Sequence, residues 1–81
     1  MVYGELQRYA EAIEALKRAI QLKPGYAQAH FNLGMIYLHL NAKEAALQQL
    51  RELKALNGAL ALELIDAIHM SKVINVDRLR P

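Results

Sequence analysis

The chain has 81 residues, of which 54% are hydrophobic and 22% are charged. This composition suits one small folded domain and excludes both a second independent core and a disordered tail. Ten Lys and Arg residues against eight Asp and Glu residues leave a formal charge of +2, and both signs are scattered, so no basic block points to nucleic acid. The absence of cysteine excludes disulfides, thiol nucleophiles and cysteine-ligated metals. No stretch predicts a membrane span or a secretory signal, so a cytoplasmic location is favoured.

The first predicted helix runs from Tyr9 to Leu22, where apolar residues recur at steps of three and four. Lys23-Pro24-Gly25 ends this helix, because proline disfavours a helical conformation in the preceding residue and has no amide hydrogen. Met1 to Leu6 falls in the register of a separate preceding helix. A single continuous helix from Gly4 to Leu22 is the alternative.

The second predicted helix begins near Ala27 and is apolar nearly all the way round, which indicates contacts on two sides. Asn41-Ala42 is a weak break, after which an amphipathic helix is expected from Glu44 to Leu56.

Asn57-Gly58 supplies residues that tolerate a left-handed backbone, which predicts the end of the third helix there. A fourth helix is expected at 59–74. The β-branched run that begins at Val73 lowers helix propensity, so 75–81 is expected to be a frayed tail.

The sequence repeats itself at a shift of 34 residues, which aligns Ala12 with Ala46, Leu16 with Leu50 and Leu22 with Leu56. A period of this size indicates stacked supersecondary units, and the unit here is a pair of helices.

Two sets of residues carry a resemblance to the tetratricopeptide repeat family. His30-x2-Leu33-Gly34-x2-Tyr37 and Ala46-x3-Leu50 are similar to its two helices, with histidine and leucine in aromatic positions. The earlier unit matches through Ala12-x3-Leu16-x2-Ala19, through Leu22-Lys23-Pro24 and through Tyr9 in the turn. Leu53, where a small residue is usual, and Gly58, in place of the terminal proline, depart from the pattern.

The resemblance implies an all-α fold of antiparallel helix-turn-helix repeats, an α-solenoid with a C-terminal capping helix. The single domain 1–81 divides into a partial repeat at 1–25, a full repeat at 26–58, the cap at 59–74 and the tail. Gly34, Ala12 and Ala46 would be notches that admit a neighbouring helix, with leucines filling the larger gaps.

One full repeat and one partial repeat are fewer than the three or so that a stable stack needs. We therefore expect the chain to be the C-terminal end of a longer array or to form a homo-oligomer, such as a helix-swapped dimer.

Nothing in the sequence indicates an enzyme. His30, His39 and His69 stand in no catalytic pattern, and His30 is expected to act as an aromatic substitute in the helix packing. Glu63-x2-Asp66-x2-His69 lacks a fourth metal ligand. With Ser71 as the only serine and no threonine, no catalytic residue, metal or cofactor is expected.

The resemblance places a partner-binding face on the concave side of the second helix, made of Gln28, Phe31, Asn32, Met35, Leu38 and His39. Phe31, Met35 and Leu38 lie roughly opposite Leu33 and Tyr37, so they are expected to be free of the internal stack and to suit a peptide or a partner helix. In the alternative, the fourth helix or a second copy covers them.

One subset of the family grips the C-terminal carboxylate of a peptide through Lys, Asn and Arg. Only Asn32 matches that set, and Leu62 and Asp66 stand where cations would be needed. A hydrophobic or mixed peptide is therefore the expected partner; nucleic acid and membrane are not.

Overall fold

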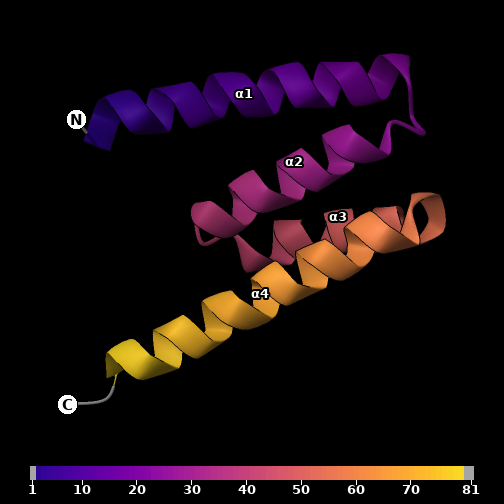
Figure 1. Ribbon diagram of the computed structural model, residues 1–81. Helices are drawn as coiled ribbons and strands as arrows, with labels where there is room; N and C mark the ends of the chain where they lie inside the picture. The colour runs from indigo at the N-terminus through magenta and orange to yellow at the C-terminus, as the bar shows by residue number, and fades with distance from the viewer. Residues whose placement is uncertain (1, 80–81) are drawn as a thin grey trace.

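The computed structural model describes the backbone of residues 2–79 and the side chains of residues 7–70. It contains helices α1 (Val2–Leu22), α2 (Ala27–His39), α3 (Lys43–Leu56) and α4 (Gly58–Leu79), and no strand occurs in the described backbone. The predicted all-α fold is confirmed. Figure 1 shows α1 and α4 along opposite edges, with α2 and α3 between them.

α2 is the centre of the stack. It packs against α1, α3 and α4, and α3 also packs against α4, whereas α1 contacts only α2 among the described helices. The Cα atoms extend over 47 × 32 × 16 Å, and the shortest dimension accommodates two layers of packed helices. Every helix therefore has a side that no other helix of the described chain covers.

The main core lies where α3 and α4 meet. Leu50, Leu53, Ala61 and Leu64 are buried there, and Ala27, Phe31, Leu60 and Ile68 pack around them. Ala29 and Leu33 of α2 and Ala46 of α3 are also buried. Leu53 is fully buried, so the large residue in a position that is usually small is part of the core.

α1 is one uninterrupted helix through Gly4. The expectation of a separate helix at Met1 to Leu6 is wrong, and the alternative of one continuous helix is the arrangement found. An interior glycine costs a helix only about 1 kcal/mol. Without a proline, that cost does not end the helix.

The turn between α2 and α3 depends on Asn41, which has a left-handed backbone with φ of 67°. The Asn41 N–H donates to the Leu38 carbonyl at 3.0 Å, and the Ala42 N–H donates to the Tyr37 carbonyl at 2.7 Å. These two bonds form a Schellman motif, in which the left-handed residue lets the chain satisfy the last carbonyls of the helix.

The junction of α3 and α4 differs from the prediction. Asn57 is extended, with φ of −158° and ψ of 101°, and Gly58 is not left-handed. The Asn57 N–H donates to the Leu53 carbonyl at 2.7 Å, while its side-chain Oδ1 accepts from the Leu60 N–H at 3.1 Å. Because one residue separates the two helices, Asn57 ends α3 and caps α4 at once.

The backbone of α4 stays helical to Leu79. This is beyond the predicted helix end at 74, and it includes most of the segment expected to fray. β-branched residues lower helix propensity by only a few tenths of a kcal/mol each. No proline or glycine interrupts this part of the sequence.

Candidate interaction surface

The polar residues of the predicted binding face lie on the open side of α2. Gln28 and Asn32 are exposed, one helical turn apart, and the Gln28 Nε2 donates to the Asn32 Oδ1 at 3.5 Å. Their remaining donors and acceptors face solvent, where the backbone of a bound segment can reach them.

Phe31 does not have the freedom that the sequence predicted. It is half-buried and packs against the core of α3 and α4. The reason is that α4 approaches α2 on this side, and the helix spacing within α2 does not reveal that approach. Phe31 therefore belongs to the internal stack and presents only part of its surface to a partner.

The rest of the predicted face is exposed except at Leu38. Met35 is 37% exposed, and Leu38 is half-buried. His39 is exposed, with its ring centroid 5.0 Å from that of Tyr9 on α1. This aromatic contact links α2 to α1 at the boundary of the face.

α4 adds exposed apolar side chains that the sequence analysis did not assign to the face. Leu62 is 63% exposed and Ile65 is 36% exposed. Their spacing places them, with Asp66 and His69, along one side of α4. The same spacing can be read from the sequence, which indicates that these residues share one side of the helix. It does not show which side of α4 the other helices cover.

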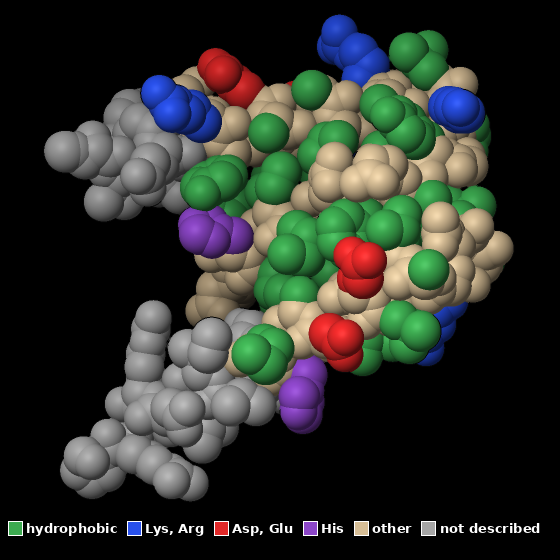
Figure 2. Space-filling model, in the orientation of Figure 1, with side chains coloured by type: hydrophobic (Ala, Val, Ile, Leu, Met, Phe, Trp, Pro, Cys, Tyr) green, Lys and Arg blue, Asp and Glu red, His purple; other side chains and the backbone are tan. Residues whose placement is uncertain are grey.

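We call the surface made of Phe31, Met35, Leu38, Leu62 and Ile65 the α2–α4 face. Figure 2 shows hydrophobic side chains gathered between α2 and α4, with acidic side chains over α4 at the edge of this band. The band between the two helices is therefore apolar, and acidic side chains lie at its edge on α4.

A buried polar network lies on another side of α2. His30 is 5% exposed. Its Nδ1 lies 2.8 Å from the Gln49 Oε1, and its Nε2 lies 3.1 Å from the Pro24 carbonyl oxygen. The carbonyl only accepts, so Nε2 carries a proton. The Gln49 amide can offer its oxygen to a protonated Nδ1 or its NH₂ group to an unprotonated one.

His30 therefore has the buried packing position predicted for it, and it also ties α2 to α3 and to the α1–α2 loop. No pattern in the sequence predicts these hydrogen bonds. A hollow of about 420 Å³ adjoins this network between α1, α2 and α3. Its lining comprises Lys17, Ile20, Gln21, Pro24, His30, Leu33, Gln48, Gln49 and Glu52. Both ring nitrogens of its one histidine are already hydrogen-bonded.

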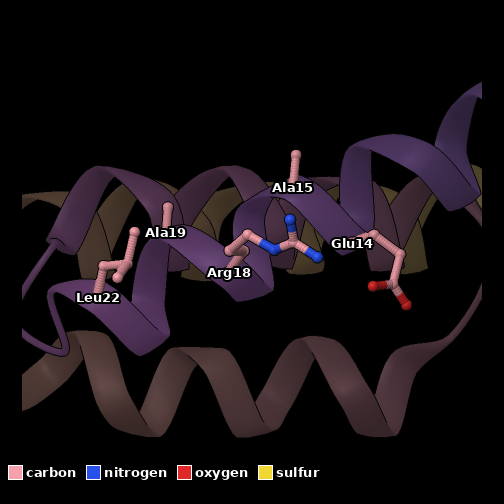
Figure 3. A pocket seen from close by; sticks show the side chains of 5 residues that line it. All are labelled: Glu14, Ala15, Arg18, Ala19 and Leu22. Atoms are coloured by element: carbon pink, nitrogen blue, oxygen red, sulfur yellow. The ribbon is translucent and has the colours of Figure 1, made fainter.

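A second hollow, of about 480 Å³, lies on the outer face of α1 (Figure 3). Its lining residues are Glu14, Ala15, Arg18, Ala19 and Leu22. Leu22 is 83% exposed. A shift of 34 residues turns these five positions into Gln48, Gln49, Glu52, Leu53 and Leu56 of α3. Gln49 is in contact with α2, so the outer face of α1 is the repeat counterpart of a surface that α3 uses for packing.

Two further properties bear on function. Among the described residues, no three His, Asp or Glu side chains lie close enough together to hold a metal ion. The described helices also include none with the length and hydropathy needed to cross a membrane.

Comparison of the sequence with protein-family models agrees with the helical-repeat arrangement of the structure. Residues 2–41 match a family model described as TPR repeat, and residues 27–59 match one described as Tetratricopeptide repeat. No curated protein and no solved structure gave a significant match. The two matches overlap on α2, the helix on which the other three pack, and together they cover 2–59. The chain therefore belongs to the tetratricopeptide repeat family.

Proposed function

We propose that this chain is a non-enzymatic module that binds a peptide or a helix of a partner protein on the α2–α4 face. Tetratricopeptide repeats generally mediate contacts between proteins. The observation that carries the proposal is the exposure of Leu62 and Met35, at 63% and 37%, beside a core that is already closed.

Apolar side chains on this face gain by being covered, because each Å² of apolar surface removed from water contributes about 25 cal/mol. Gln28 and Asn32 at the rim supply hydrogen-bonding groups for the backbone of an extended segment. A short apolar segment with a polar backbone matches both features, as does one side of an amphipathic helix.

Selection from a random-peptide library displayed on phage, with the folded chain as bait, tests the proposal. Leu62→Asn combined with Met35→Asn should weaken the selected peptides at least tenfold, measured by fluorescence anisotropy. The matched control is Leu47→Asn with Leu56→Asn, two leucines of α3 that are 36% and 40% exposed. Peptides that lose affinity only for the control variant would contradict the proposal.

Self-assembly is a second candidate function, supported by the outer face of α1. At a shift of 34 residues, the outer face of α1 corresponds to the surface of α3 that contacts α2. In the described part of the chain, Leu22 is exposed on this face of α1. A helix from a second copy would bury Leu22 against Ala15 and Ala19.

Sedimentation velocity over a range of concentrations separates the two functions. A mass that rises with concentration, and that Leu22→Glu returns to the monomer, would support self-assembly. Leu22 is too exposed for this change to disturb the fold. A strictly monomeric mass at millimolar concentration would reject self-assembly.

A further inference from the structure

We infer that the segment bound by the α2–α4 face is basic as well as apolar, with Lys or Arg side chains that pair with Glu63 and Asp66. This inference rests on the proposed function, because it concerns the partner of the same face. It follows from the distribution of charge over the four helices.

None of the described cations belongs to α2 or α4, the two helices of this face. Every described Lys and Arg side chain lies on α1, on α3 or in the loop between α1 and α2, namely Arg8, Lys17, Arg18, Lys23, Lys43, Arg51 and Lys54. α2 has no residue with a fixed charge. Among the described side chains of α4, only Glu63 and Asp66 have one, and both are negative.

These two carboxylates belong to the same turns of α4 as Leu62 and Ile65. Asp66 is four positions after Leu62 and next to Ile65, and Glu63 is next to Leu62. Both carboxylates are exposed, and Figure 2 shows acidic side chains at the edge of the hydrophobic band. They can reach a segment lying on that band without being buried.

No Lys or Arg stands three or four positions from either carboxylate along α4, so helix neighbours do not neutralise them. Among the described side chains, His69 stands three residues after Asp66 on α4, and His39 lies at the end of α2. A partner that covers Leu62 and Ile65 also removes water from around the carboxylates, which strengthens their attraction for a cation. An acidic segment would be repelled in the same way, so the charges select the partner.

The peptide selection tests this inference when the charges are removed without changing side-chain size. Glu63→Gln with Asp66→Asn should lower the affinity of selected peptides about tenfold, the scale of two exposed ion pairs. The matched control is Glu44→Gln with Glu52→Gln on α3, which changes the net charge equally. We expect the control to bind like the unmodified chain and the selected peptides to combine apolar residues with Lys or Arg. Raising NaCl to about 0.5 M should remove most of the difference between variant and unmodified chain.

The outcomes separate the inference from the proposed function. Neutral or acidic peptides that still depend on Leu62 and Met35 would overturn the basic partner and leave the binding face standing. Basic peptides weakened equally by both charge variants would also overturn it, because the change in net charge, rather than the position of the two carboxylates, would then explain the loss. Peptides that depend on neither Leu62 nor Met35 would overturn the proposed function itself.

Discussion

Leu64 of α4 occupies the space beside Gly34 of α2. A β-carbon on Gly34 would lie 2.8 Å from Cδ2 of Leu64, closer than real β-carbons come to other heavy atoms. The Cβ of Gln49 on α3 would be 3.4 Å away. The missing side chain therefore lets both α3 and α4 approach α2, and it sets the distance between the helices that carry the α2–α4 face.

Substitutions at Gly34 should cost stability in proportion to their size. Gly34→Leu should lower the free energy of unfolding by about 1–3 kcal/mol through overpacking. Gly34→Ala should lower the free energy of unfolding by less. Alanine gains about 1 kcal/mol of helix propensity over glycine, and a methyl group of Leu64 can move away from the added β-carbon. Urea denaturation measures both, with Gly58→Ala as the control, since an added β-carbon there meets no atom within 4 Å. A Gly34→Leu variant as stable as the unmodified chain would contradict the close approach.

Leu53→Ala should destabilise the chain by about 2–5 kcal/mol, because it leaves a cavity in the core. Leu53 is fully buried, whereas Leu56 on the same helix is 40% exposed. Leu56→Ala is therefore the matched control, expected to cost less than about 1 kcal/mol. Thermal and urea unfolding of the two variants provide the comparison. Similar losses for both would show that α4 does not close over Leu53.

His30→Phe should lower the free energy of unfolding by about 1 kcal/mol, although phenylalanine keeps the aromatic volume. The variant loses the hydrogen bonds to Gln49 and to the Pro24 carbonyl, each of which contributes about 0.5–1.5 kcal/mol, while a more apolar ring partly offsets the loss. His30→Ala should cost more, because it also leaves a cavity. If His30→Phe proved more stable than the unmodified chain, the polar network would not support the fold.

Asn41→Gly should leave stability unchanged or raise it slightly, because glycine adopts the observed φ of 67° without strain. Asn41→Ala should lower the free energy of unfolding by about 1 kcal/mol, since the short polar side chain of asparagine tolerates the left-handed region and the methyl group of alanine does not. The difference between the two variants in urea denaturation isolates the backbone effect. Equal stabilities would show that the turn between α2 and α3 does not need a left-handed residue.

The helices and their pairing followed from the sequence because they depend on patterns along the chain. The 34-residue shift and the apolar spacing predicted the helices, while Lys23-Pro24-Gly25 and Asn57-Gly58 predicted boundaries near Leu22, Ala27 and Leu56. The conformations of the two asparagines that follow helices could not be predicted in this way. Asn41 and Asn57 both tolerate a left-handed conformation, and which one adopts it depends on the length of each connection.

The candidate face was harder to predict for a three-dimensional reason. The sequence placed Phe31 and Met35 on one side of a helix, and helix spacing does not tell which of the two a neighbouring helix covers. Phe31 packs on the core of α3 and α4, whereas Leu62 and Ile65 on α4 stay exposed. The family resemblance pointed to Leu62 and Asp66 of α4, whereas the exposure of Ile65 emerged only with the packing of α4.

NMR mapping of a selected peptide on the ¹⁵N-labelled chain tests the central claim most directly, because it reports which helices a partner touches. Our account predicts that amide shifts change most at 28–39 of α2 and 62–69 of α4, while the exposed side of α3 around Leu47 and Arg51 changes little. The largest changes on α3, with α2 and α4 unaffected, would contradict the account.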